Sequence, residues 1–218
     1  SPAPGAAAAQ GAAAAQGAAG ELALTLPWLP DRAEDIRTLS RKCREDLVEA
    51  LGGRAAAAEM AMLEIGGYRG YTTRFLAEHF RVVISLESEA EHVAVMRRVL
   101  AGAPAAVVLH HHTRRDDPRA VAARAEAAGG VDVVLLDGGR GHEAMLHDLR
   151  LAVFSGLGPP ARGGRPRFLV LDDHDERAEV AQAAVDFVAL GHLRPLAGRP
   201  LLGHAEAALF EVVPALAE

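Results

Sequence analysis

An acidic residue stands at the end of each of four apolar runs in this chain. These acids are Glu64, Glu87, Asp137 and the adjacent pair Asp172 and Asp173. If the runs are parallel strands, their carboxyl ends meet at one edge of a sheet, which is where α/β proteins bind ligands. Carboxylates at that edge can accept hydrogen bonds from a ribose or hold a hard divalent cation. The acids therefore predict a single site along this edge.

A glycine-bearing turn and then a helical pattern follow the first acid, in residues 65–80. Free backbone N–H groups at such a turn can hold an anionic or carboxylate-bearing cofactor. Glu87 lies about 20 residues beyond Gly66, a spacing that suits an acid accepting both hydroxyls of a ribose in a dinucleotide or an adenosyl cofactor. Tyr68 and Tyr71 stand where a dinucleotide loop needs its second and third glycines. Their bulk disfavours a nicotinamide-dependent oxidoreductase and favours S-adenosylmethionine.

Apolar and amphipathic segments alternate regularly from residue 60 onward. The expected strands are 60–64, 82–86, 106–109, 131–136 and 168–171, and the expected helices are 72–80, 89–100, 118–128, 143–154 and 176–190. Residues 192–196 and 208–213 are expected to close the sheet as an antiparallel pair, joined by residues 197–205. Nearly continuous Val and Leu runs are typical of parallel strands buried on both faces. The pattern predicts an α/β, doubly wound, Rossmann-like fold.

The segment that precedes these strands divides into two parts. Residues 1–20 repeat alanine, glycine and glutamine and are expected to form a disordered tail. Residues 21–54 contain Trp28 and an apolar periodicity that predicts a helix capped at Asp31 and ended by glycines, which packs on the sheet or covers a ligand as a lid. Its one cysteine, Cys43, lies on the apolar stripe and is expected to be buried. Residues 55–218 are expected to form the cofactor-binding domain.

Composition narrows the class of protein. The net charge of −6 gives no basic footprint for nucleic acid, and no apolar run approaches the roughly 18 residues of a membrane span. A single cysteine excludes a disulfide within the chain. We therefore expect a soluble, intracellular protein, and its compartment, cytoplasmic or an organellar matrix, stays open.

Residues 64–72, with the sequence EIGGYRGYT, resemble the cofactor motif of class I S-adenosylmethionine-dependent methyltransferases. The form is E-x-G-x-Y-x-G-Y-S/T, as in the metal-dependent catechol and caffeoyl-CoA O-methyltransferases, and the resemblance extends over residues 60–213 in strand order and motifs. It implies a methyltransferase fold with a mostly parallel seven-stranded sheet and an antiparallel C-terminal strand. The cofactor contacts that it implies come from Glu64, Gly66, Tyr68, Gly70, Thr72, Glu87 at the ribose, His111 and His112 near the adenine, and Asp137.

The same resemblance implies that Asp137, Asp172 and Asp173 hold a divalent metal, expected to be magnesium. Hard carboxylate oxygens suit Mg²⁺, and a metal-bound hydroxyl has a lowered pKa that favours the nucleophilic oxyanion. The alternative is that these aspartates cap helices or pair with arginines.

The chain departs from its relatives at the catalytic base. The relatives carry lysine or histidine three residues after the first metal aspartate, where this chain has Arg140. Arginine stays protonated, so Arg140 could only stabilise an oxyanion. His142 is either a substitute base or a solvent-facing residue at the start of a helix. Residues 137–149, which end in Asp148-Leu149, resemble the D-G-x-H-x-Y…D-L segment of a sugar-modifying O-methyltransferase type, with its histidine missing.

Two functions follow from this comparison. The first is methyl transfer from S-adenosylmethionine to an oxygen of a small molecule with metal assistance. The alternative is a catalytically impaired methyltransferase-fold subunit that acts as a structural or interaction protein in a larger assembly. The expected partners are a small-molecule acceptor and either another protein or a second copy of the chain, with no nucleic acid and no membrane.

Overall fold

A computed structural model of the chain describes residues 38–214, except residues 104, 139–140, 174–176 and 199. The expectations for the tail, Trp28, Asp31 and Arg140 lie outside the described residues. The strands are β1 (Ala61–Ile65), β2 (Val82–Glu87), β3 (Ala106–His110), β4 (Val133–Leu136), β5 (Phe168–Leu171), β6 (Leu193–Pro195), β7 (Leu201–Leu202) and β8 (Ala207–Val212). The helices are α2 (Arg41–Ala50), α3 (Arg54–Ala57), α4 (Tyr71–Ala77), α5 (Ala90–Val99), α6 (Arg119–Ala127), α7 (His142–Phe154) and α8 (Ala178–Ala189), with a 3₁₀ turn, η1 (Pro160–Arg162), after α7.

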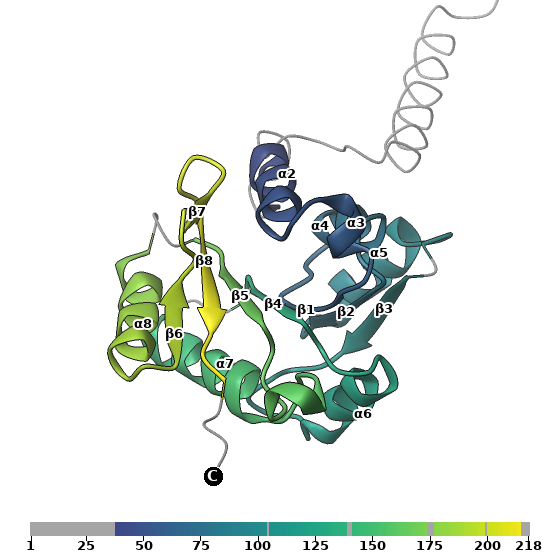
Figure 1. The fold of residues 1–218 in the computed structure, drawn as a ribbon. Helices are drawn as coiled ribbons and strands as arrows, with labels where there is room; N and C mark the ends of the chain where they lie inside the picture. The colour runs from purple at the N-terminus through teal and green to yellow at the C-terminus, as the bar shows by residue number, and fades with distance from the viewer. Residues whose placement is uncertain (1–37, 104, 139–140, 174–176, 199, 215–218) are drawn as a thin grey trace, which may run out of the picture.

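The strands form one mixed sheet in the order β3-β2-β1-β4-β5-β8-β6 (Figure 1). The first five are parallel, and β8 runs antiparallel to both β5 and β6. At the centre, Leu63 of β1 pairs with Ile84 of β2 and with Val134 of β4. The chain leaves β1 toward β2 and returns at β4, so the strand order reverses between β1 and β4. Ligands bind at such a reversal in α/β sheets. The predicted doubly wound fold is confirmed.

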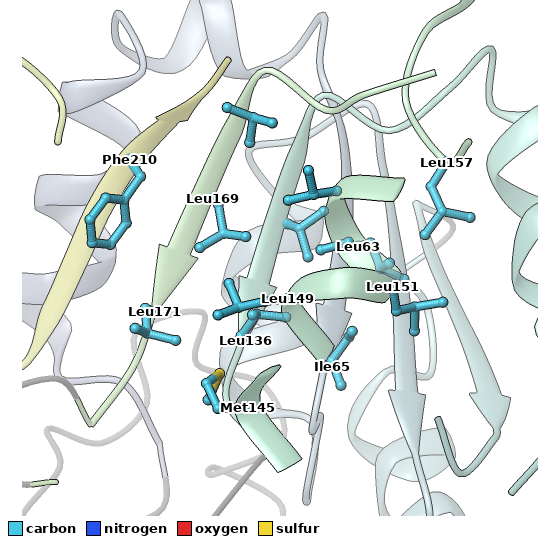
Figure 2. Close-up of a cluster of buried hydrophobic side chains, with 14 of the residues drawn as sticks. Leu63, Ile65, Leu136, Met145, Leu149, Leu151, Leu157, Leu169, Leu171 and Phe210 are labelled. Carbon is cyan, nitrogen blue, oxygen red and sulfur yellow. The ribbon is translucent and has the colours of Figure 1, made fainter. Parts of the chain in front are cut away.

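Helices cover both faces of the sheet. Helices α2, α3 and α4 lie on one face and α6, α7 and α8 on the other (Figure 1). Each face buries its own apolar cluster, because alternate residues of a strand point to opposite sides. Figure 2 shows the cluster under α7, in which the labelled strand residues Leu63, Ile65, Leu136, Leu169 and Leu171 lie against Met145 and Leu149 of that helix.

The N-terminal helix begins later than its apolar periodicity predicts. Residues 38–40 are not helical, and α2 starts at Arg41 after Ser40, whose hydroxyl accepts a hydrogen bond from the N–H of Cys43 at 3.1 Å. This side-chain cap satisfies one of the unpaired N–H groups of the first turn. The expected helical position of Leu39 is therefore wrong, although Cys43 is fully buried as predicted.

Helix α2 is tied to the edge of the sheet that carries the acids. The N–H of Ser40 donates to Glu206 Oε1 at 2.8 Å, and the N–H of Gly203 donates to Asp46 Oδ2 at 3.0 Å. These bonds join α2 to the β7–β8 turn. Strand β7 itself lies within residues 197–205, where no strand is predicted, and it adds an eighth strand to the expected seven. None of the helices among the described residues is long and apolar enough to cross a membrane.

Candidate cofactor-binding and active site

Strand alternation places the polar residues of the carboxyl edge on the face covered by α2 and α4. Met62, Val83, Val133 and Phe168 belong to the apolar cluster of that face. Counting onward by twos along each strand leads to Glu64, Ser85, Glu87, Asp137 and Asp172. The structure therefore brings together the acids of four neighbouring strands, β2-β1-β4-β5, as their positions in the sequence predict.

The turn after β1 is shaped by its glycines. Gly66 has φ +99°, and a Cβ there would lie 2.6 Å from the carbonyl oxygen of Asp137. The turn consequently packs directly on the loop that follows β4. Gly66 N–H and Gly67 N–H both donate to the carbonyl of Leu86, at 2.9 and 3.0 Å. These two N–H groups are therefore used within the protein, and the predicted cofactor contacts of Gly66 and Gly70 stay predictions.

Glu87 is buried at the end of β2 and is held by the backbone on both oxygens. Its Oε2 accepts from Tyr68 N–H at 2.8 Å and its Oε1 from Glu89 N–H at 2.8 Å. The ring of His92 lies beside it, with Nδ1 at 3.6 Å from Oε1 and its ring centroid 4.6 Å from that of Tyr68. Each carboxylate oxygen can accept more than one hydrogen bond. Glu87 is therefore a rigid acceptor with capacity left for two hydroxyl groups.

Glu64 is fully buried, and sequence reasoning did not identify its partners. Its Oε2 accepts hydrogen bonds from the hydroxyls of Thr73 on α4 and Ser85 on β2. Its Oε1 has no hydrogen-bond partner among the described residues. Burial raises the pKa of Glu64 to about 7, against the lowering effect of the two hydroxyl bonds. Thr72 Oγ1 accepts a hydrogen bond from the N–H of Leu39 at 3.3 Å, and the predicted contact of Thr72 with the cofactor stays a prediction.

This raised pKa predicts how stability depends on pH. Glu64 takes up its proton more tightly when folded, so its contribution to stability is fully present below pH 4.5 and is lost as pH rises toward 7. We expect the unfolding free energy of the ligand-free protein to fall by about 2 kcal/mol from this group between pH 5 and pH 8. Urea titrations of the wild type and of Glu64→Gln measure the difference. An equally steep pH dependence in the variant would show that another group is responsible.

The three aspartates that were predicted to bind a metal differ in their surroundings. Burial and the neighbouring Asp172 carboxyl raise the pKa of Asp137 well above its usual range, and Glu64 and Asp173 add to the effect. Asp173 has φ +55° and accepts a hydrogen bond from Arg177 Nε at 2.8 Å. Within the described part of the chain, no three His, Cys, Asp or Glu side chains are grouped so as to hold a metal ion. The arginine partner of Asp173 matches the alternative reading of this residue.

The two histidines predicted near the adenine lie on the loop after β3. The N–H of His111 donates to the carbonyl of Glu87 at 2.9 Å, which places this loop beside the ribose candidate. His111 is buried, and its Nε2 has no hydrogen-bond partner among the residues described. Burial lowers the pKa of His111, so its ring is neutral near pH 7. His112 donates its N–H to Asp116 Oδ2 at 2.7 Å, which closes a turn of the loop.

His142 is the first residue of α7. Its Nε2 donates to Asp186 Oδ2 on α8 at 2.8 Å, and the two side chains are 34% and 38% exposed. The residue therefore ties α7 to α8 at the start of the helix. This contact depends on the packing of two helices and has no local signal in the sequence. A role of His142 as a catalytic base stays a prediction.

No protein-family model and no curated protein sequence matches this chain. Its structure is similar to an O-methyltransferase from Bacillus cereus in complex with S-adenosylhomocysteine, with 17% identity, 79% of each chain covered and a TM-score of 0.53. It is also similar to the O-methyltransferase TomG of Streptomyces achromogenes in complex with S-adenosylmethionine, with 16% identity, 79% of this chain and 80% of that chain covered and a TM-score of 0.54. A precorrin-6y C5,15-methyltransferase from Geobacter metallireducens matches at 10% identity, 83% and 92% coverage and a TM-score of 0.53. The chain has the fold of the class I S-adenosylmethionine-dependent methyltransferases.

Proposed function

We propose that this protein is an S-adenosylmethionine-dependent methyltransferase that acts on an oxygen atom of a small molecule. The observation that carries the proposal is a row of three buried polar residues at the ends of adjacent strands: Glu64, Glu87 and His111. Glu64 and His111 each bury an atom without a hydrogen-bond partner among the described residues. Buried polar atoms in proteins nearly always have partners, so these two favour a polar ligand at this edge.

The chemistry of the three residues fits the parts of this cofactor. Glu87 is a carboxylate with capacity for the two ribose hydroxyls. The Oε1 of Glu64, which no described residue hydrogen-bonds, is an acceptor suited to the ammonium of the methionine part. The neutral ring of His111 suits the adenine. Two of the similar solved structures contain S-adenosylhomocysteine or S-adenosylmethionine, which supports this assignment.

The protein contributes mainly orientation to such a reaction. When bound, S-adenosylmethionine supplies a methyl group on a positively charged sulfur. Glu87 and Glu64 hold the cofactor at two fixed points, which lowers the entropy cost of aligning sulfur, methyl carbon and acceptor oxygen. The acceptor must also lose a proton. We propose His142 as the base for that step, and Arg140, which stays protonated, as the group that stabilises the oxyanion.

Methyl-labelled S-adenosylmethionine tests this activity. The purified chain is incubated with labelled cofactor and a panel of catechols, phenols and sugars, and the products are analysed by mass spectrometry. We expect a new O-methyl group in at least one class of hydroxyl compound. The net charge of −6 supports a small acceptor over a nucleic acid. Label transferred only to nitrogen, or only to an added RNA, would contradict the proposal.

A divalent cation fits part of the predicted metal site. Asp137 and Asp172 are neighbouring carboxylates, and a cation between them would relieve the repulsion and burial that raise the pKa of Asp137. Asp173 does not fit, because Arg177 holds it. We propose Asp137 and Asp172 as the protein ligands of a magnesium ion, which when bound would polarise an acceptor hydroxyl.

Magnesium should stabilise the folded protein if this site exists. We expect a saturable rise in the unfolding temperature with added Mg²⁺, because a ligand that binds only the folded state stabilises it. Asp172→Asn should abolish the rise, whereas Asp117→Asn, at an exposed side chain, should keep it. Differential scanning fluorimetry measures all three proteins. Equal rises in both variants would show that the cation binds elsewhere.

The N-terminal segment 21–54 is proposed to border the acceptor side of the site. Leu39 N–H donates to Thr72 Oγ1 at the start of α4, and Ser40 N–H donates to Glu206. These bonds bring the chain at residues 39–40 to the edge that carries the acids.

The second candidate function is an impaired methyltransferase fold that serves as an interaction subunit. The bond between His142 and Asp186 favours it, because this bond gives His142 a structural role in joining α7 to α8. Measuring both cofactor binding and methyl transfer on the same purified protein distinguishes the two functions. Binding of S-adenosylhomocysteine without turnover on any acceptor, together with co-purification of a stable partner, would favour the second candidate.

A further inference from the structure

The loop between β3 and α6, residues 111–118, is held by a helix that is distant in sequence. Thr113 donates its hydroxyl to Asp148 Oδ1 of α7 at 2.7 Å. The carbonyl oxygen of the same threonine accepts from His147 Nε2 at 3.0 Å. Two consecutive residues of α7 thus hold both the side chain and the backbone of one loop residue.

Asp148 is buried, so its hydrogen bond to the loop matters for stability. The residue is 4% exposed in the middle of α7, where it neither caps the helix nor ends a strand. Burial of a carboxyl is unfavourable unless it gains hydrogen bonds. Burial raises the pKa of Asp148, and the bond from Thr113 is the largest effect in the opposite direction. The contact with the loop therefore offsets the cost of placing an acid there.

Helix α7 is a rigid support for the loop. Its residues Met145 and Leu149 are buried against the strands, as Figure 2 shows. The same helix begins directly after the loop that carries Asp137. Through Thr113, α7 therefore fixes the position of the loop after β3 relative to the loop after β4.

The held loop carries His111, two residues before Thr113. His111 N–H donates to the carbonyl of Glu87, and its buried Nε2 has no partner in the described part of the chain. We propose that His147 and Asp148 are positioning residues, which hold the loop so that His111 and Glu87 present one continuous surface to the adenosine part of the cofactor. This assignment rests on the proposed function.

Isosteric substitutions of Thr113 test the assignment. Thr113→Val removes the hydroxyl and keeps the shape, whereas Thr113→Ser keeps the hydroxyl. We expect Thr113→Val to weaken S-adenosylhomocysteine binding about tenfold in titration calorimetry, as the loss of one hydrogen bond implies, and Thr113→Ser to stay close to the wild type. In turnover assays the valine variant should raise KM for S-adenosylmethionine and leave kcat unchanged.

A second pair of variants keeps the test independent of folding defects at Thr113. Asp148→Asn retains an acceptor for the hydroxyl and should bind like the wild type, whereas His147→Ala loses the backbone contact and should bind more weakly. Circular dichroism establishes that each variant is folded. If Thr113→Val and His147→Ala were folded and bound S-adenosylhomocysteine with wild-type affinity, the positioning role of His147 and Asp148 would be overturned, and the proposed function would stand. Absence of binding by the wild type would overturn the proposed function and this assignment with it.

Discussion

Replacing Glu87 with alanine is expected to raise the dissociation constant for S-adenosylhomocysteine about 100-fold. A hydrogen bond to a charged group contributes about 1.5–3 kcal/mol, and 100-fold in affinity corresponds to about 2.7 kcal/mol. The loss has two sources. The ribose hydroxyls lose their acceptor, and the N–H of Tyr68 loses the carboxylate that fixes the turn. Titration calorimetry of the purified variant measures the change.

Two further variants separate these sources. Glu87→Gln keeps one acceptor oxygen and should lose only part of the affinity. Glu89→Ala removes an exposed side chain but keeps the backbone N–H that Glu87 accepts from, so it should bind like the wild type. If Glu87→Ala bound the ligand within about threefold of the wild type, which is less than 1 kcal/mol, Glu87 would not be the ribose acceptor.

Gly66→Ala is expected to destabilise the fold and abolish cofactor binding. Its φ of +99° costs a side chain about 1–2 kcal/mol, and a Cβ at 2.6 Å from the carbonyl oxygen of Asp137 forces the loop after β4 to move. Such overpacking adds about 1–3 kcal/mol. We expect a loss of about 3 kcal/mol in unfolding free energy, which for a chain of this size lowers Tm by roughly 6–12 °C.

Gly102→Ala is the matched control for this variant. Gly102 also has a positive φ, +78°, but nothing lies within 4 Å of a Cβ built there. It should therefore lose only the backbone contribution, about 1 kcal/mol, and keep cofactor affinity. Equal losses in the two variants would show that the contact between the turn and the Asp137 loop is unimportant. Thermal unfolding and calorimetry on both proteins provide the comparison.

Much of the fold follows from local patterns in the sequence. Strands buried on both faces give continuous Val and Leu runs, so the predicted segments coincide with β1 to β5 to within about two residues. The start of α2 was missed because its apolar period continues back through Leu39, whereas the capping hydroxyl of Ser40 determines where the helix begins. Strand β7 was not predicted because it has only two residues, which are too few to show an alternation of apolar and polar side chains.

The sequence predicts those site residues whose positions depend only on where the parallel strands end. Glu64, Glu87 and Asp137 meet because parallel strands end at one edge and alternate residues share a face. Ser85 could have been found by the same rule, since it lies two residues before Glu87. Asp148, the partner of Thr113, could not have been predicted, because this contact comes from the packing of α7 against a loop that is distant in sequence.

The metal prediction shows a limit of reasoning from strand ends. Position in the sequence places Asp172 and Asp173 together, but the backbone turns between them. Asp173 adopts φ +55° and its side chain pairs with Arg177, four residues later. Both carboxyls raise the pKa of Asp137, but Asp172 has the larger effect, and Asp173 is paired with an arginine. The backbone angle that decides this is not encoded in residue type.

Titration calorimetry of the full chain with S-adenosylhomocysteine tests whether the carboxyl edge of this sheet binds the cofactor. We predict saturable binding to a single site near neutral pH, with NAD giving no heat under the same conditions. NAD carries a pyrophosphate, and Tyr68 stands where a dinucleotide loop needs a glycine so that its backbone can approach that group. Absence of binding at millimolar S-adenosylhomocysteine, or tighter binding of NAD, would contradict the assignment of Glu64, Glu87 and His111 to an adenosyl cofactor.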